Sequence, residues 1–194
     1  FEYLNELQSK GLQVFVTSHS PTITAKSDVN NISILQRKQS IIQSFSFDEL
    51  SEDDYPKESK RHLRKFLDTT KAQLFFANGV LLVEGVAEAI IIPILAKKFL
   101  TEKIDLCKSG IELVNIGGVA FNHFGLLFNN DDERKRLLSK CAIITDSDPK
   151  DNGDISDRAQ KAKDLEKHNL KVCLATHTLE HDLFEQSERN KAIM

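Results

Sequence analysis

The chain has 194 residues, of which 40% are hydrophobic, and a formal net charge of -3 at pH 7. This length and apolar content suit one large globular domain, or a small domain joined to part of another. The near-neutral charge excludes nucleic-acid binding through overall positive charge, so such binding needs a local basic patch or bridging divalent cations. No run approaches the roughly 18 consecutive apolar residues of a membrane span, so we expect no membrane partner.

The first residue and the cysteines indicate the cellular compartment. The chain begins with Phe1 and shows no basic stretch followed by an apolar one, as a secretory signal would. We therefore expect a cytoplasmic protein, of which this chain is a piece.

The three cysteines, Cys107, Cys141 and Cys173, are far apart and form no CxxC pair. Cys141 and Cys173 lie in apolar, strand-like runs, which predicts buried thiols in a reducing compartment.

The first predicted elements are short. Residues 1–11 read as the end of a helix, with Gly11 at the position of a C-terminal cap. The run LQVFVTSHSP (12–21) is typical of a buried strand that leads into a polar loop. Residues 31–37 and 40–47 are two further strand-like runs, and their short separation predicts a hairpin.

A charged stretch follows the predicted hairpin. Residues 48–60, DELSEDDYPKESK, are dense in charge and contain a proline, which predicts a linker. A basic helix is predicted over residues 60–77, because Leu63, Phe66 and Leu74 recur there at helical spacing.

The remainder of the chain repeats a strand–helix pattern. The predicted strands are 80–85, 111–118, 141–148 and 170–177. The predicted helices are 87–100, 157–169 and one that begins at Thr178, with a helical or loop stretch over 121–140. Strands that alternate with helices imply right-handed crossovers and a parallel sheet. In such a sheet the functional residues gather at the carboxyl ends of the strands.

Carboxylates stand at three of these strand ends. Glu84 ends the first strand, and Glu88 lies one helical turn later. Asp146 and Asp148 end the third strand, two residues apart, so an extended chain would project both to one side. Glu180 follows the fourth strand. Such carboxylates raise one another's pKa unless cations neutralise them, and Mg²⁺ binds through one or two carboxylates plus substrate phosphates.

Each acid also has a structural alternative. Glu84 would favour the positive end of the helix that follows it. Asp146 and Asp148 would serve as turn or cap residues, and Glu180 as an acid of a first helical turn. The joint pattern, an acid at the tip of the first strand and Asp-x-Asp at the tip of the third, favours a metal site.

Two motifs carry a resemblance to a known family. VLLVEG at 80–85 and ITDSD at 144–148 together resemble the Toprim domain of topoisomerases, primases and related nucleases. The lead-in from Leu63 to Ala96 and the segment TLEHDLF at 178–184 resemble the OLD family of ATP-dependent endonucleases. In that family an ABC-type ATPase precedes a Toprim nuclease in one polypeptide.

The resemblance implies a metal-dependent nuclease. It implies Glu84, Asp146 and Asp148 as metal ligands of the catalytic centre, with Glu88 and Glu180 as further ligands. It also implies Mg²⁺ or Mn²⁺ as cofactor, DNA as substrate, and defence against phage. For the full-length protein it implies ATP as a second cofactor.

The N-terminal part resembles a fragment of an ATPase. Ser18-His19-Ser20 follows a strand-like run, as in the switch-histidine segment of ABC-type ATPases, which implies that His19 senses a nucleotide. An ordinary histidine in a polar loop is the alternative. No G-x-x-x-x-G-K-[ST] phosphate loop occurs, so we expect no ATP hydrolysis by this chain alone. The family places a catalytic lysine beyond the TLE segment, where only Lys191 remains, and we do not assign it that role.

We therefore predict an α/β chain with three parts. Residues 1–50 are the tail of an ABC-type ATPase domain, and 51–77 form a linker and basic helix. Residues 78–194 form a Toprim-like parallel sheet flanked by helices, truncated at its C-terminus. The expected partners are DNA, the ATPase portion of the same polypeptide and a second copy in a homo-oligomer. The sequence does not indicate which residues bind nucleic acid.

The expected activity is hydrolysis of DNA phosphodiester bonds, and two alternatives stay open. The first is a module that binds metal and nucleic acid, or dimerises, without cleaving. The second is a zinc peptidase, because His177-Thr-Leu-Glu180-His181 matches the H-x-x-E-H pattern.

Overall fold

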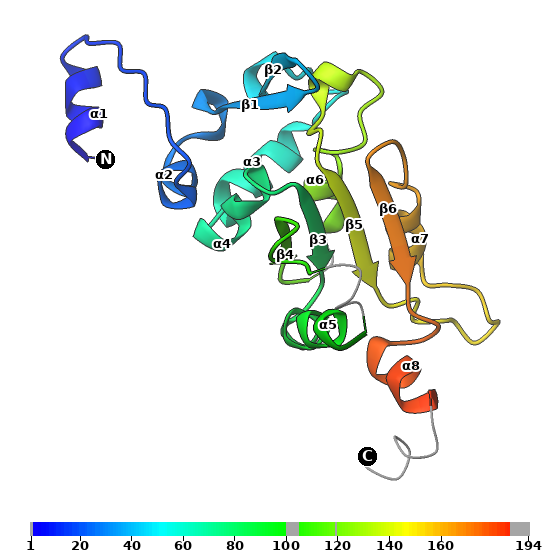
Figure 1. The fold of residues 1–194 in the computed structure, drawn as a ribbon. Coiled ribbons are helices and arrows are strands. Elements are labelled where there is room, and N and C mark those ends of the chain that lie inside the picture. Colours follow the sequence, from blue (N-terminus) through cyan, green and yellow to red (C-terminus); the bar gives the residue numbers. More distant parts are fainter. Residues whose placement is uncertain (1, 100–104, 119, 187–194) are drawn as a thin grey trace.

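The computed structural model describes residues 2–99, 105–118 and 120–186, and its centre is a four-stranded parallel sheet (Figure 1). The strands, in the spatial order β4-β3-β5-β6, are β4 (Ile111–Asn115), β3 (Gly79–Val83), β5 (Lys140–Thr145) and β6 (Leu170–Leu174). The helices that follow these strands in sequence are α6 (Phe121–Gly125), α5 (Val86–Phe99), α7 (Asp157–Lys163) and α8 (Leu179–Glu185). The predicted α/β class, with a parallel sheet flanked by helices, is confirmed.

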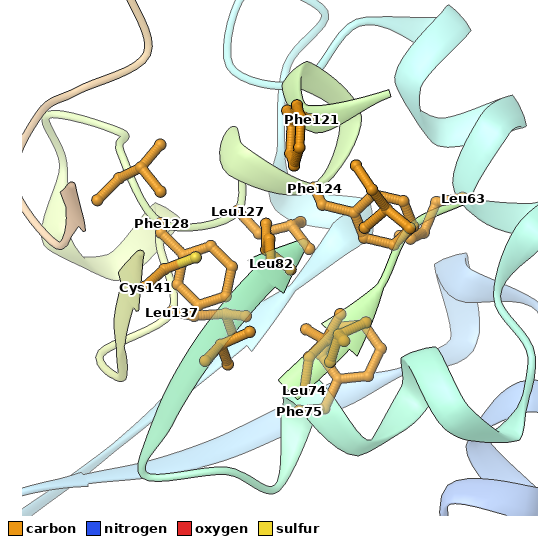
Figure 2. Close-up of a cluster of buried hydrophobic side chains, with 14 of the residues drawn as sticks. Leu63, Leu74, Phe75, Leu82, Phe121, Phe124, Leu127, Phe128, Leu137 and Cys141 are labelled. Carbon is orange, nitrogen blue, oxygen red and sulfur yellow. The ribbon is translucent and has the colours of Figure 1, made fainter. Parts of the chain in front are cut away.

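One face of the sheet carries the main core. Alternate side chains of β3 and β5, among them Leu82 and Ile143, point to this face and are fully buried. Phe124 of α6 and Phe128 just after it pack into the same cluster (Figure 2). The two central strands are apolar along nearly their whole length because both of their faces are covered.

The edge strand β6 corrects one prediction about the cysteines. Cys141 of β5 is buried, as expected, but Cys173 of β6 is exposed. Side chains alternate between the two faces of a strand, so Val172 packs against the core and Cys173 points to the opposite face. Few side chains cover that face of the edge strand, so the Cys173 thiol is exposed although it lies in an apolar run.

The predicted strand at the start of the chain is not present. Residues 12–20 have no regular secondary structure, and Phe15 is 82% exposed. A strand exists only when its backbone pairs with a neighbour, and no strand pairs with this segment within the described part of the chain. The predicted helix before it is present as α1 (Glu2–Ser9), and Gly11 adopts the left-handed φ of +84° expected of a cap.

The predicted basic helix over residues 60–77 is broken into three pieces. These are α3 (Lys57–Phe66), α4 (Thr69–Ala72) and the 3₁₀ helix η3 (Gln73–Phe75). The break lies at Asp68, whose carboxylate accepts a hydrogen bond from the Lys71 backbone N–H at 2.8 Å. An aspartate at this position caps a new helix and ends the previous one, a local signal that apolar periodicity does not report.

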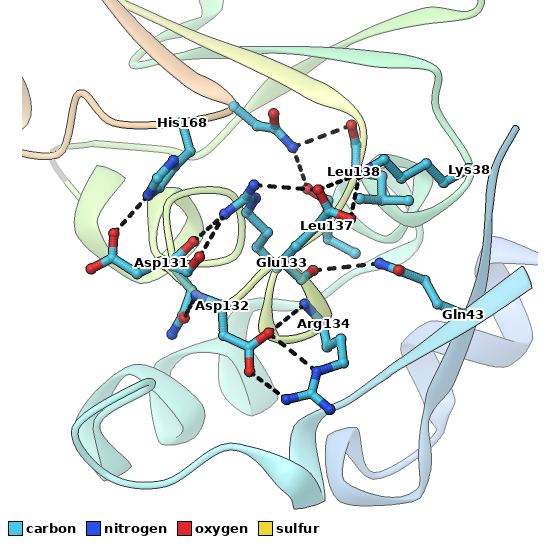
Figure 3. Close-up of polar contacts among 12 residues, drawn as sticks. Lys38, Gln43, Asp131, Asp132, Glu133, Arg134, Leu137, Leu138 and His168 are labelled. Atoms are coloured by element: carbon cyan, nitrogen blue, oxygen red, sulfur yellow. Dashed lines mark hydrogen bonds and ion pairs between the residues drawn. The ribbon is translucent and has the colours of Figure 1, made fainter. Parts of the chain in front are cut away.

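The predicted hairpin is present and docks beside the sheet through polar contacts. It comprises β1 (Ser33–Lys38) and β2 (Ile41–Ser46), which lie between short elements α2 (Pro21–Lys26), η1 (Val29–Asn31) and η2 (Phe47–Glu49). The Gln36 amide donates to the Arg136 carbonyl at 3.2 Å and accepts from the Leu138 N–H at 2.7 Å. Lys38 pairs with Glu133 of η4 (Glu133–Lys135) at 2.6 Å (Figure 3).

The charged stretch predicted as a linker packs against the sheet-bearing part. Tyr55 is 1% exposed, and its hydroxyl donates to the His123 carbonyl of α6 at 2.5 Å. A single core cluster contains residues from both sides of position 78, from Val29 to Leu170. The two domain boundaries therefore stay predictions. No helix among the described residues is long and apolar enough to span a membrane.

A stacked histidine pair joins α3 to α6 and makes stability depend on pH. The rings of His62 and His123 lie 4.2 Å apart, and Ser59 contacts the His123 ring nitrogen at 2.9 Å. Burial lowers the pKa of both histidines below the ordinary value of 6.5, and the charge of His123 lowers that of His62 further. Lys65, Lys71 and Glu58 are the other charged groups that act on His62.

The pKa values of both histidines are lower in the folded state than in the unfolded state, so their neutral forms stabilise the fold above about pH 6.5. This stabilisation is lost as the pH falls from 6.5 through the folded-state pKa values. We expect the free energy of unfolding to decrease between pH 7 and pH 5, and to decrease less in His62→Gln. Urea unfolding at both pH values measures this. His19→Gln, at an exposed histidine, is the control and should keep the pH dependence of the parent. Equal pH dependence in parent and His62→Gln would contradict the assignment.

Candidate active site

Two acids meet where the central strands end. Glu84 follows β3 and Asp146 follows β5, and these strands pair in parallel with Val83 opposite Ile144. Thr145, the last residue of β5, donates its hydroxyl to Glu84 Oε2 at 3.0 Å. The pairing of β3 with β5 therefore brings together two acids that are far apart in the sequence.

Asp146 lies in the middle of the acidic cluster. Burial raises the pKa of Asp146, and the hydrogen bond from the Leu179 backbone N–H, at 3.0 Å, opposes that effect. The negative charges of Asp148, Glu84 and Glu88 raise this pKa further. Three carboxylates are thus close enough to act on Asp146, and a bound cation would stabilise such an arrangement.

Asp148 reaches the cluster by a turn and not by strand alternation. β5 ends at Thr145, and Asp148 has a φ of +40°, so the expectation of an extended Asp-x-Asp was wrong. The backbone N–H groups of Ser147 and Asp148 both donate to the His177 carbonyl, at 3.1 and 3.2 Å. This turn is tolerated because aspartate is among the non-glycine residues that adopt the left-handed region most readily.

Glu88, one turn into the helix after β3, is held at the back of the site. It is 8% exposed, and its Oε2 accepts a hydrogen bond from the Gly85 backbone N–H at 3.1 Å. A side chain at position 85 would bring a Cβ within 2.9 Å of that same oxygen. The glycine of the VLLVEG motif thus leaves room for the second glutamate.

Arg158 is a site residue that the sequence reasoning missed. It lies near the start of α7, and its guanidinium contacts Glu84 Oε1 at 3.1 Å and Asp148 Oδ2 at 2.5 Å. It is 10 residues from Asp148 and far from Glu84 in sequence, in a helix that reads as solvated. No local pattern gave a signal for it, because the contact forms only once α7 packs against the folded sheet, where its nearest strand is β6.

A small cavity opens beside these acids. Its volume is about 160 Å³, and its lining includes Glu88, Asp146, Leu179 and Asp182. Glu180, the acid named from the sequence, is exposed in the first turn of α8 and does not line the cavity. Asp182 instead accepts from the Thr176 backbone N–H at 2.8 Å, so it braces the loop before α8.

The donor set suits a hard divalent cation, although the carboxylates do not form a closed cage. Among residues 2–99, 105–118 and 120–186, no three His, Cys, Asp or Glu side chains are arranged around one metal position. Mg²⁺ needs only one or two protein carboxylates, and water and substrate phosphates complete its shell. Glu84 and Asp146 meet that requirement, so the residues fit a cation that is completed by substrate.

The other candidate residues lie elsewhere. His19 is exposed, with its ring 6.1 Å from that of Phe76, just before the amino end of β3 and thus at the edge opposite the acids. His177 precedes α8, which begins at Leu179, so the H-x-x-E-H segment does not present both histidines from one helix. The described residues do not include Lys191, residue 100 of the predicted helix 87–100, or the end of the last predicted helix.

The part of the chain that contains these acids matches a known family model. Residues 75–148 match the family described as overcoming lysogenization defect protein-like, TOPRIM domain. This segment of the chain is similar to OLD-like TOPRIM domains. The matched segment begins just before β3 and ends at Asp148, so it contains Glu84, Glu88 and both strand-end aspartates. The resemblance drawn from the VLLVEG and ITDSD motifs is confirmed.

Relatives extend the likeness beyond the OLD-like TOPRIM segment. The chain is 27% identical over 145 residues to the Old nuclease of Escherichia phage P2, a match that covers 74% of this chain and 25% of that protein. It is also 27% identical to the C-terminal region of the Xanthomonas campestris pv. campestris OLD protein, with a TM-score of 0.39 over 57% of each chain. The chain thus spans about a quarter of the length of the curated relative.

Proposed function

We propose that this chain carries the cleaving site of a nuclease that hydrolyses DNA phosphodiester bonds with Mg²⁺ or Mn²⁺. The observation that carries the proposal is the meeting of Glu84 and Asp146 at adjoining strand ends within the OLD-like TOPRIM segment. A DNA phosphate is itself an oxygen ligand for such a cation, so an acidic site on a chain of net negative charge still suits this substrate.

Each residue has a distinct part in the proposed reaction. A divalent cation supplies polarisation of the scissile phosphate and stabilises the charge that develops on it. Glu84 together with Asp146 or Asp148 would hold this cation, with Glu88 behind them. Thr145 orients Glu84 through its hydroxyl, and the Leu179 N–H orients Asp146. Ligands fixed by such hydrogen bonds are already positioned when the substrate arrives.

Other parts of the proposal rest on the family resemblance. They are coupling to an ATPase portion of the same polypeptide, nucleotide sensing by His19, a homo-oligomeric state and a role against phage. The main alternative is a module that binds metal and DNA without cleaving. Glu180 stays a proposed ligand for a second cation, although its exposed position makes Asp182 the nearer acid to the cavity.

The proposal is tested by a cleavage assay on supercoiled plasmid with Mg²⁺, Mn²⁺ or EDTA. We expect nicking or linearisation with the metals alone, and a decrease of roughly 100-fold in Glu84→Gln, since that change removes a charged ligand but little volume. Glu112→Gln is the matched control, because Glu112 is also a strand residue but lies near the amino end of β4. DNA binding without cleavage in the parent would favour the non-cleaving module, and cleavage in EDTA would refute metal dependence.

A further inference from the structure

A single arginine connects the two strand-end motifs. The Arg158 guanidinium contacts Glu84 with one terminal nitrogen, at 3.1 Å, and Asp148 with the other, at 2.5 Å. The side chain of Arg158 is 34% exposed and those of Glu84 and Asp148 are 21% and 43% exposed, so water screens these pairs only in part. The planar, two-pronged guanidinium suits such a bridge between two carboxylates.

The bridge leaves part of the arginine unsatisfied. Arg158 Nε is buried and has no hydrogen-bond partner among the described residues. A buried donor without an acceptor costs free energy, so the guanidinium is held in place by its two ion pairs and not by a complete hydrogen-bond set. Its position therefore depends on the charges of Glu84 and Asp148.

A metal ion at this site would need the same carboxylate oxygens that Arg158 contacts. Glu84 Oε1 contacts Arg158, and Glu84 Oε2 accepts the Thr145 hydroxyl, so both oxygens of this carboxylate are engaged. A divalent cation bound to Glu84 and Asp148 would stand beside a positive guanidinium, which it repels. Metal and Arg158 would therefore compete for these two carboxylates.

We propose that Arg158 is an internal counter-ion that competes with divalent cations for Glu84 and Asp148. Arg158 is then a positioning residue, which keeps the two acids together and sets the metal concentration at which the site fills. The inference rests on the proposed function, because it requires that these acids bind metal. Loss of Arg158, unlike loss of a ligand, should therefore strengthen the binding of metal.

The test is a calorimetric Mn²⁺ titration of the parent chain, Arg158→Gln and Arg158→Lys. We expect Arg158→Gln to bind Mn²⁺ about tenfold more tightly, the equivalent of one or two partly screened ion pairs that no longer have to be broken. Arg158→Lys should fall between the two, because an ammonium group keeps the charge but loses the fork that reaches both acids.

The control separates a local effect from one of net charge. Arg64→Gln also removes one positive charge and one ion pair, with Asp28 at 3.0 Å, on α3 and away from the site. It should leave Mn²⁺ affinity unchanged. Thermal unfolding adds a second readout, since Arg158→Gln should unfold at a lower temperature than the parent in EDTA and regain the difference in saturating Mn²⁺.

The outcomes separate this inference from the function on which it rests. Mn²⁺ binding in the parent that is unchanged or weaker in Arg158→Gln overturns the counter-ion role and leaves the metal site intact. Binding in the parent that is tighter in Arg158→Gln and unchanged in Arg64→Gln supports it. A parent chain that binds no Mn²⁺ overturns the proposed function, and the counter-ion role with it.

Discussion

Asp146→Asn should lower DNA cleavage by roughly 10²–10³-fold, the range found when one group that stabilises the transition state is removed. Asp146 directly follows β5, and the charges of Asp148, Glu84 and Glu88 act on it. Asparagine keeps the oxygen that accepts the Leu179 N–H, so the backbone around the site should be preserved. The lower activity would therefore result from the lost charge. It is measured as the initial rate of plasmid nicking at saturating Mg²⁺.

The same variant should bind Mn²⁺ roughly 100-fold more weakly in a calorimetric titration. Asp164→Asn is the control, because it removes one negative charge at the C-terminal end of α7, where Gln160 donates to it. The control should keep both affinity and rate. Full cleavage activity in Asp146→Asn would show that the strand-end acids serve as caps and turns and are not ligands.

Phe124→Ala should destabilise the fold by about 3–5 kcal/mol, the usual cost of emptying a large buried aromatic site. Phe124 is 0% exposed and packs in the cluster between α6 and the sheet (Figure 2). Its ring also lies 6.1 Å from that of His62, so the loss would affect the contact between α3 and α6 as well. Urea unfolding followed by circular dichroism measures the change.

Phe15→Ala is the matched control for this prediction. It is the same chemical change at a side chain that is 82% exposed, and it should alter stability by no more than about 0.5 kcal/mol. A small effect in Phe124→Ala, similar to that of the control, would mean that the cluster closes around the missing ring. It would also weaken the assignment of the main core to this face of the sheet.

The sequence by itself determined the strands of the sheet and the identity of the acids that end them. Apolar runs such as VLLV and CAII are long enough, and free enough of polar residues, to predict central parallel strands. The rule that parallel strands present their carboxyl ends at one edge then placed Glu84 and Asp146 together. Both inferences depend on local patterns, which a single segment carries within itself.

The tertiary structure alone decided the features that require two distant segments. The segment 12–20 has the composition of a strand, but no strand pairs with it among the described residues, and Cys173 lies in an apolar run whose outer face is uncovered. Asp148 enters the site through a turn fixed by the His177 carbonyl. Arg158 completes it from α7, which comes within reach of Glu84 only after folding. Which strands pair, which faces are covered and which distant ion pairs form all depend on the segments that become neighbours in the fold. The residue pattern of one segment does not specify those neighbours.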